Sequence, residues 1–369
     1  MIRKTGVLND RATRSEFFEE SEPFMKQAVM TQPGKIEFRD VECPQPDADE
    51  VLLKIRRIGV CGSDIHVYHG QHPYTTYPVI QGHEVGAVVA QIGSQVHGLE
   101  IGDKVVFLPQ VTCGECYPCR HGLYHICDNL KVMGFQTNGA AQEYFSVKAS
   151  QVLKVPTEVS LDQAALIEPV SVAVHALSRA GDIRGKRVVV LGAGTIGNLV
   201  GQVAQATGAA GVLITDVSDY KLAKAHQCGL MHTANTRREN LSQVILDTFG
   251  PDKADLILEC VGIQETINQA VESARKGSTI VIVGVFAKKP EVDIGVVQDH
   301  ELSLVGTLMY QKKDFERAID LVASGKLQLT PLVTHRFPFS HYLDAYKTIE
   351  AVNGQYMKVM IDLESEGEL

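Results

Sequence analysis

The chain has 369 residues, which is more than one hydrophobic core normally supports and suits two domains. Hydrophobic residues make up 44% and charged residues 21%, and no apolar run reaches the roughly eighteen residues of a membrane span. Acidic residues outnumber basic ones by 44 to 35, and the net charge of −9 disfavours binding to nucleic acids or to anionic lipid surfaces.

The first segment of the chain, residues 1–24, differs in composition from the rest of the sequence. It mixes both charge signs and lacks the apolar stretch of a secretory signal, and its acidic cluster argues against a mitochondrial transit peptide. We expect an N-terminal extension on a cytoplasmic protein. Eight cysteines, four of them within residues 113–127, favour an intracellular metal site over a disulfide framework.

From Met25 the sequence alternates apolar and polar residues between Pro and Gly, which predicts a β-rich domain. From about residue 185, strands alternate with helical stretches, the pattern of parallel βαβ units. Two helix-like stretches and a strand near the end of the chain are too short for a separate core, so they should pack on the first domain. We therefore predict an α/β protein with a β-rich domain (residues 25–170 and 306–369) and a doubly wound parallel sheet (residues 171–305).

Four closely spaced cysteines form the strongest local pattern: Cys113, Cys116, Cys119 and Cys127. Their spacing, C-x2-C-x2-C-x7-C, lets four thiolates fold around one tetrahedral zinc ion. Four thiolates leave no open coordination position, so we expect a structural zinc that holds a loop. An iron–sulfur cluster, which also takes four thiolates, is the alternative, and four unrelated reduced cysteines are a weaker one.

A second set of metal-binding residue types is spread along the chain: Cys61, His83 with Glu84, and Glu168. Each alone is weak evidence, since a single Cys or His is more often a packing or surface residue. Together they offer a three-point zinc site with one position free for water or substrate, and Asp64 can orient the His83 ring. The cysteines outside both sets should be buried small apolar residues: Cys43, Cys228 and Cys260.

A glycine pattern, G-x-G-x-x-G, begins at Gly192 and continues with Gly194 and Gly197. An apolar strand at residues 187–191 precedes it, and a helix whose apolar face starts at Ile196 comes after it. In this context the glycines permit a tight turn, close approach of a pyrophosphate and tight helix–strand packing. We predict a dinucleotide site that includes Ile196.

An aspartate, Asp216, ends the next predicted strand, nineteen residues after Gly197. A carboxylate there can accept hydrogen bonds from both ribose hydroxyls but repels a 2′-phosphate, so the coenzyme should be NAD and not NADP. Lys221, one helical turn later, either touches the adenosine ribose or is a solvated helix residue.

The order of these motifs, GVCGSDIH, GHE, the four cysteines, IEP and LGAGTIG, resembles the zinc-dependent medium-chain dehydrogenase/reductases over residues 25–369. The chain is most similar to the sorbitol (polyol) dehydrogenase branch, because Glu168 stands where ordinary alcohol dehydrogenases have a second cysteine. The resemblance implies a GroES-like catalytic domain, a Rossmann domain that binds NAD, two zinc ions per chain and a homotetramer or homodimer.

The resemblance also implies the reaction: a small-molecule alcohol loses a hydride to NAD at a catalytic zinc. Ser63 and His66 then form a proton relay from the zinc-bound oxygen toward solvent, while His69 and His72 are expected to be exposed loop histidines. Glu84 or Glu168 can instead act through a bound water, and which of the two binds zinc directly stays open. The combined zinc set disfavours a non-catalytic nucleotide-binding or structural protein.

Two differences from the polyol dehydrogenases bear on the substrate. Animal sorbitol dehydrogenases carry a tyrosine where this chain has Val67, and an arginine near 308–310, where it has Leu-Met-Tyr. Met133 and Phe135 should also make the pocket more apolar. We expect a polyol, cyclitol or sugar acid, with 2,3-butanediol or threonine as the alternative. Residues 301–310 are expected to supply an edge strand between Rossmann domains of two subunits.

Overall fold

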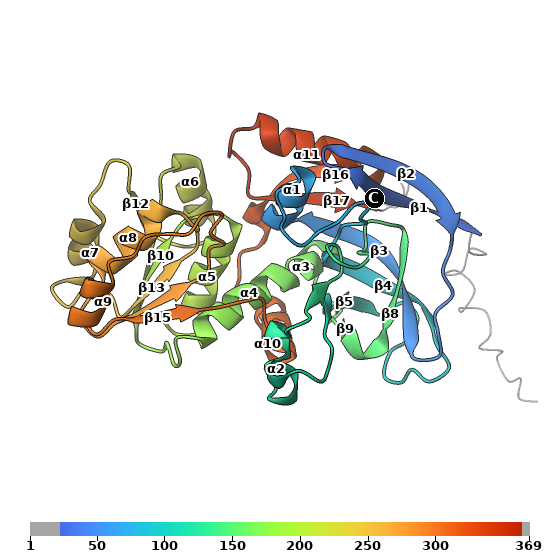
Figure 1. The fold of residues 1–369 in the computed structure, drawn as a ribbon, viewed down its shortest axis with the longest axis horizontal. Coiled ribbons are helices and arrows are strands. Elements are labelled where there is room, and N and C mark those ends of the chain that lie inside the picture. The colour runs from blue at the N-terminus through green and yellow to red at the C-terminus, as the bar shows by residue number, and fades with distance from the viewer. Residues whose placement is uncertain (1–22, 364–369) are drawn as a thin grey trace, which may run out of the picture.

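The computed structural model describes residues 23–363, which form two bodies (Figure 1). Helix α4 (Ile167–Ser178) lies between them and packs on helices of both. Of the predicted extension at 1–24, residues 1–22 lie outside the described residues, and strand β1 already begins at Phe24. No helix in the described part of the chain has the length and apolar content that a membrane span requires.

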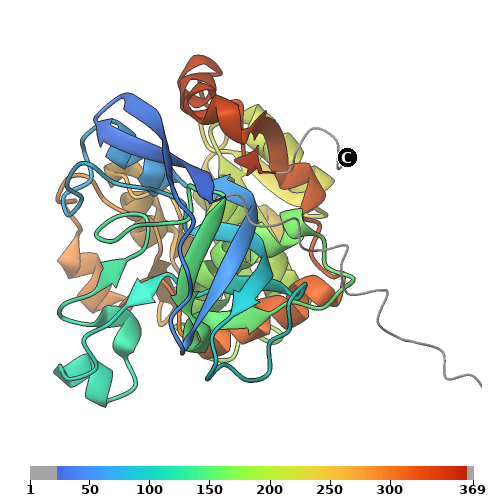
Figure 2. The ribbon, with the colours of Figure 1, turned by 90° about the vertical axis from the view of Figure 1, so that its right-hand side faces the viewer.

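The first body is built on a seven-stranded, mostly antiparallel sheet (Figure 2). Strand β3 lies at its centre and pairs with β4, β8 and β17, so most of its side chains are buried. The strands of this sheet are β3 (Glu50–Val60), β4 (Glu84–Ile92), β5 (Lys104–Phe107), β8 (Tyr144–Lys148), β9 (Val152–Lys154), β16 (Val333–Pro338) and β17 (Lys358–Asp362). Two small ribbons flank it, formed by β1 (Phe24–Gln32) with β2 (Lys35–Glu42) and by β6 (Gln110–Val111) with β7 (Lys131–Val132).

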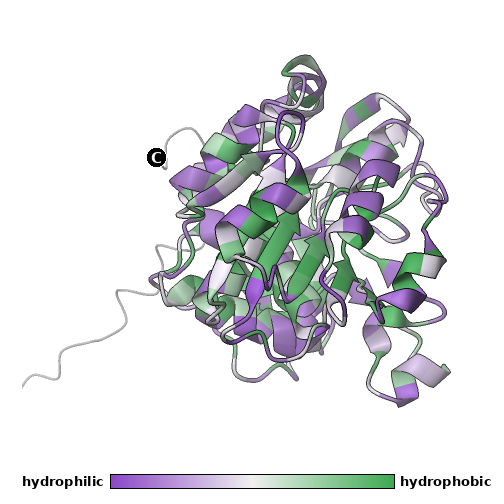
Figure 3. Ribbon diagram, turned by 90° about the vertical axis from the view of Figure 1, so that its left-hand side faces the viewer, coloured by the Kyte–Doolittle hydropathy of each residue, from purple (hydrophilic) through white to green (hydrophobic). Residues whose placement is uncertain are grey.

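The second body holds a six-stranded parallel sheet in the order β12-β11-β10-β13-β14-β15. Its strands are β10 (Arg187–Leu191), β11 (Gly211–Asp216), β12 (His232–Asn235), β13 (Leu256–Glu259), β14 (Thr279–Ile282) and β15 (Ser303–Gly306). The inner strands β10, β11, β13 and β14 are nearly continuous apolar runs because helices cover both faces, as the apolar strands between polar helix surfaces show (Figure 3). The order reverses between β10 and β13, and ligands of such sheets bind beyond the carboxyl ends of the strands at this point.

The helices show the predicted alternation with strands. In the second body they are α5 (Thr195–Ala206), α6 (Asp219–Gln227), α7 (Leu241–Phe249), α8 (Gln264–Ser273) and α9 (Ile294–Asp299). The other helices are α1 (Gly62–Tyr68), α2 (Tyr117–Arg120), α3 (Leu161–Ala165), α10 (Lys312–Ala323) and α11 (Tyr342–Ala351). The predicted α/β architecture with a second, β-rich body is confirmed.

The end of the chain returns to the first body. Strand β15 is an edge strand of the parallel sheet, α10 then packs against α4, and α11 packs against β16 and β17. Strand β17 completes the return by pairing with β3. This return places residues near 310 and 358 beside residues near 60 and 168, which the local sequence pattern does not reveal.

The cysteines outside the two predicted metal sets differ in burial. Cys228 is buried as predicted, whereas Cys43 and Cys260 are only half-buried. The prediction was wrong for these two because each comes directly after the last residue of a strand, β2 or β13, where the chain leaves the sheet.

Candidate active site

Strand register brings three predicted metal donors together. Strands β3 and β4 are antiparallel, with Gly59 opposite Glu84, so Cys61, just after the end of β3, lies beside His83, just before the start of β4. The Cys61 thiol, one ring nitrogen of His83 and one carboxylate oxygen of Glu84 lie within 4.8 Å of one another. This sulfur, nitrogen and oxygen donor set suits a zinc ion that keeps one position open.

A buried carboxylate and a buried lysine border this donor group. Lys358 of β17 donates to both carboxylate oxygens of Glu84, at 2.7 and 2.6 Å, and to the carbonyl of Val60 at 3.2 Å. A Cβ at Gly59 would lie 2.2 Å from Glu84 Oε2, so glycine makes room for this carboxylate. Sequence reasoning missed Lys358, although a lysine inside the apolar strand KVMID is a signal of a buried partner.

Asp64 faces the histidine of the donor group. Its Oδ1 lies 3.6 Å from His83 Nδ1, an ion-pair distance, and its Oδ2 accepts a hydrogen bond of 2.9 Å from the Cys61 backbone N–H. Burial lowers the pKa of His83, but the charges of Asp64 and Cys61 outweigh it and raise that pKa to about 10. The surroundings therefore stabilise positive charge at His83, which agrees with a site for a metal cation.

Glu168 lies near this group but not within it. It occupies the first turn of α4, is buried, and its Oε1 accepts a hydrogen bond of 2.7 Å from the Tyr310 hydroxyl. Burial raises the pKa of Glu168 to about 7, although the charge of His83 opposes the shift. Of the two glutamates, the structure places Glu84 with Cys61 and His83. Glu168 is held instead by Tyr310. Sequence reasoning noted Tyr310 only because it lies in the stretch where animal sorbitol dehydrogenases have an arginine, and did not predict this contact.

The predicted proton relay lies on α1. Ser63 is half-buried, and His66 comes three residues later on the same side of the helix and is exposed. Within residues 23–363 no hydrogen bond joins these two side chains, so a relay would need a water or the substrate between them. The structure therefore places a half-buried serine two residues after Cys61 and an exposed histidine one helical turn later, both on α1.

An apolar wall adjoins the donor group. Met133 and Phe135 are buried, and the Phe135 ring centroid lies 4.9 Å from that of His83. The other side of this wall carries His72, whose ring stacks on Phe135 at 4.9 Å. The prediction of an exposed loop histidine was wrong for His72 because this stacking half-buries it. His69 is exposed, and its Nε2 bonds to Glu350 at 2.6 Å.

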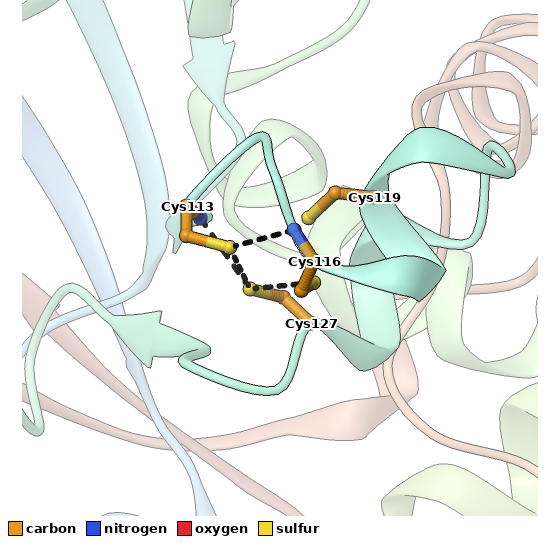
Figure 4. A group of neighbouring side chains, drawn as sticks. All are labelled: Cys113, Cys116, Cys119 and Cys127. Carbon is orange, nitrogen blue, oxygen red and sulfur yellow. Dashed lines mark hydrogen bonds between the residues drawn. The ribbon is translucent and has the colours of Figure 1, made fainter.

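The four cysteines of the loop point toward one another (Figure 4). All four sulfur atoms lie within 4.8 Å, with 3.5 Å between Cys113 and Cys127 and 3.8 Å between Cys116 and Cys127. A tetrahedron with Zn–S bonds of about 2.3 Å has edges of about 3.8 Å, so the spacing fits one central ion. Hydrogen bonds from the backbone N–H groups of Glu115 and Cys116 lower the pKa of Cys113 to about 6, which favours the thiolate. These residues fit a closed zinc site better than a larger iron–sulfur cluster.

The glycine loop connects β10 to α5. Gly192 has a φ of 98°, which favours glycine, and a Cβ at Gly197 would lie 1.8 Å from the Gly192 carbonyl oxygen. A Cβ at Gly194, in contrast, would meet no protein atom within 4 Å. Gly192 and Gly197 are therefore required by the fold, and Gly194 leaves open space at the N-terminus of α5, where a pyrophosphate can approach.

Of the other predicted coenzyme residues, Asp216 contacts this loop and Ile196 directly follows it. Asp216 ends β11, and its carboxylate accepts hydrogen bonds from the backbone N–H groups of Ala193, at 2.8 Å, and Ser218, at 2.9 Å. The carboxylate thus lies directly beside the glycine loop. Lys221 is half-buried near the start of α6, and Ile196 packs its side chain against the core beneath α5, which leaves its backbone for a ligand.

Two alanine substitutions should separate the roles of these glycines. Gly197→Ala should lower the free energy of unfolding by about 2 kcal/mol or more, because the methyl group collides with the Gly192 carbonyl. Gly194→Ala should leave the melting temperature unchanged but weaken coenzyme binding at least about tenfold. Thermal unfolding and calorimetric coenzyme titration measure the two effects; normal coenzyme affinity in Gly194→Ala would contradict the proposed loop contact.

Known proteins match this chain along most of its length. The family model for the alcohol dehydrogenase GroES-like domain matches residues 47–157, and that for zinc-binding dehydrogenases matches residues 195–324. A 2-dehydro-3-deoxy-L-galactonate 5-dehydrogenase from Pseudoalteromonas atlantica is 37% identical, covering 87% of this chain and 94% of its own. A D-xylulose reductase from Saccharomyces cerevisiae is 36% identical, covering 86% and 92%.

Solved structures agree with these relatives. A zinc-binding dehydrogenase from Sinorhizobium meliloti 1021, bound to NADP, superposes with a TM-score of 0.86 at 29% identity and covers 92% of this chain and 100% of its own. Both bodies and the linking helix thus match a dehydrogenase fold. The chain belongs to the zinc-dependent medium-chain dehydrogenase/reductase family and is an oxidoreductase similar to the sorbitol dehydrogenases.

Proposed function

We propose that the protein is an NAD-dependent zinc dehydrogenase that oxidises a secondary alcohol of a polyol, cyclitol or sugar acid. The observation that carries this proposal is the donor group of Cys61, His83 and Glu84, whose ligand atoms lie within 4.8 Å of one another. A second zinc at the four cysteines would stabilise the loop. The small-molecule alcohol is the only partner that the reaction requires besides NAD.

The chain's own residues divide the work of this reaction. Zinc held by Cys61, His83 and Glu84 would make a substrate hydroxyl more acidic, and NAD at the glycine loop would take up the hydride. The hydroxyl proton would pass to Ser63, which gives up its own proton through a water to His66, and the exposed imidazole releases it to solvent. Phe135 beside His83 excludes water from one side of the site.

Glu168 offers a second route for the proton. It is buried, held by Tyr310, and has a pKa raised to about 7, so it can accept a proton near neutral pH. This route would run from the substrate through a water to Glu168, without Ser63 or His66. Substitutions at His66 and at Glu168 should therefore have different effects under the two routes.

The proposed coenzyme preference rests on Asp216. Its carboxylate lies beside the glycine loop, where it would face the 2′-phosphate of NADP, and the resulting repulsion should cost a few kcal/mol. We expect kcat/KM with NAD to exceed that with NADP at least about a hundredfold. Asp216→Ser should lower the ratio of kcat/KM with NAD to kcat/KM with NADP, mainly because NAD binds less tightly. Equal use of both coenzymes by the unaltered protein would refute this assignment.

The relatives support the proposed substrate class, whereas one feature of the site favours a second candidate. The Pseudoalteromonas and Saccharomyces relatives are named for a sugar-acid derivative and for a ketose related to polyols, which supports a polyhydroxy substrate. The apolar wall of Met133 and Phe135 favours the second candidate, a short vicinal diol such as 2,3-butanediol, or threonine. A screen of polyols, cyclitols, sugar acids, diols and threonine with NAD, monitored by NADH absorbance, decides between them. No NADH from any of these alcohols with zinc-replete protein would overturn the function.

The proposed assembly is a homodimer or homotetramer. Strand β15 is one of the two edge strands of the parallel sheet, so a second copy can extend the sheet there. Sedimentation of the purified protein measures the subunit number directly.

A further inference from the structure

A chain of buried polar groups runs from α11 to the proposed catalytic metal site. The Tyr346 hydroxyl donates a hydrogen bond of 2.7 Å to Gln81 Oε1. Gln81 Nε2 in turn donates to Asp64, to the carboxylate Oδ1 and to the backbone carbonyl, each at 3.2 Å. All three side chains are at most 2% exposed. These hydrogen bonds thus connect α11 to the segment that bears Cys61.

The last member of this chain, Asp64, contacts two of the proposed metal donors. Its Oδ2 accepts the Cys61 backbone N–H at 2.9 Å, and its Oδ1 lies 3.6 Å from His83 Nδ1. This carboxylate therefore holds the backbone at Cys61 by a hydrogen bond and faces the imidazole as a charge partner, at a distance too long for a hydrogen bond to Nδ1. Whatever fixes the Asp64 carboxylate also fixes the donors, since groups that hold ligands in place tune a metal site.

The acceptors on Asp64 set the direction of the hydrogen bonds. The Asp64 carboxylate and backbone carbonyl present oxygen atoms to Gln81, so the amide turns its N–H groups toward Asp64 and its oxygen toward Tyr346. Burial raises the pKa of Tyr346 well above its usual range, so its hydroxyl stays protonated and donates to that oxygen. Tyr346 thus holds the amide in the orientation that gives Asp64 a donor.

Folding alone does not call for these polar groups. Tyr346 packs among rings, with centroid distances of 5.0 Å to Tyr68 and 5.6 Å to Tyr342, where phenylalanine would pack equally well. Replacing both partners of a buried hydrogen bond by apolar groups of the same shape can be nearly neutral for stability. A polar pair in this place therefore points to a role at Asp64.

We propose that Gln81 and Tyr346 are positioning residues that, through Asp64, hold Cys61 and His83 in the geometry that retains the catalytic metal. This inference rests on the proposed function, since it assumes a zinc ion at Cys61, His83 and Glu84. It assigns α11, which lies outside the donor loops, a part in metal retention.

The test measures zinc release from the full-length, zinc-replete protein into a chromogenic chelator. We expect two phases, one from the site at Cys61 and one from the four cysteines, and Cys61→Ser identifies the first phase by removing it. Gln81→Met should accelerate that phase about ten- to a hundredfold, the range for partners of metal ligands, and leave the four-cysteine phase unchanged. In Tyr346→Phe, the rate of zinc release in the first phase should lie between the rates of Gln81→Met and of the unaltered protein.

The double variant Gln81→Met/Tyr346→Phe separates positioning from stability. It removes both partners of the Tyr346–Gln81 hydrogen bond together, so its melting temperature should exceed that of Gln81→Met, while its zinc release stays as fast as in Gln81→Met. A cobalt-substituted sample should show a shifted visible absorption band in the same variants, because the donor geometry changes.

Three results would overturn the proposal: unchanged release in Gln81→Met, equal acceleration of both phases, or slow release restored in the double variant. Failure of the proposed function would look different. If Cys61→Ser kept both zinc ions, the metal site itself would be wrongly assigned, whatever the Gln81 variants do.

Discussion

Replacing Cys61 by serine should remove one of two zinc ions and lower kcat at least about a thousandfold, with the fold preserved. The loss is large because a bound metal supplies several kcal/mol of transition-state stabilisation, at about 1.4 kcal/mol for each tenfold in rate. The fold should survive because Cys61 begins α1 as its N-cap, a position at which serine is among the favoured residues. Metal analysis, circular dichroism and NADH formation on one preparation measure the three effects.

Two further cysteine variants serve as controls. Cys43→Ser changes a half-buried cysteine outside both metal groups and should keep both zinc ions and full activity. Cys116→Ser removes one of four thiolates from the closed site and should lower thermal stability or assembly along with zinc content. Normal kcat in Cys61→Ser would refute the catalytic site, and iron in place of zinc at the four cysteines would refute the structural one.

Replacing His66 by glutamine should lower alcohol oxidation by about tenfold to a thousandfold, near the contribution of one general acid–base group. His66 is exposed on α1, three residues after the half-buried Ser63, so it can deliver the substrate proton to solvent. Zinc content and NAD affinity should not change, because His66 lies outside the donor group and the glycine loop. Imidazole buffers should restore part of the rate by accepting the proton from outside.

The competing route through Glu168 gives the opposite pattern. Glu168 is buried with a pKa raised to about 7, and Tyr310 holds it, so it can accept the proton instead. Under that route His66→Gln keeps its rate and pH profile and shows no rescue by imidazole, whereas Glu168→Gln loses activity. Measuring kcat against pH for both variants, with zinc determined on the same samples, distinguishes the routes. An unchanged rate in His66→Gln would refute the relay.

Features that depend on neighbouring residues could be predicted from the sequence. The four cysteines lie within residues 113–127, so a short loop is enough to bring their sulfur atoms within 4.8 Å. The glycine loop likewise depends on local geometry: Gly192 needs a positive φ, and Gly197 has no room for a Cβ. Apolar periodicity also predicted the alternating strands and helices of the parallel sheet, because a strand buried on both faces is recognisable by composition alone.

Features that depend on pairing between distant strands could not be predicted in the same way. Residue types suggested Cys61, His83, Glu84 and Glu168 as donors, but only the β3–β4 register showed that Glu84 joins Cys61 and His83. The sequence pattern also suggested an exposed His72, which instead stacks on Phe135. In each case the deciding neighbour lies on another element, beyond the reach of local spacing.

The return of the chain to the first body decided the remaining features. Pairing of β17 with β3 sets Lys358 against Glu84, and α11 brings Tyr346 to Gln81, across 265 residues of sequence. Local spacing specifies which chemical groups the chain can offer, since turns and helices form from adjacent residues. Burial and the partners of each group arise when distant strands and helices pack, so the electrostatics and rigidity of the metal site are properties of the folded chain.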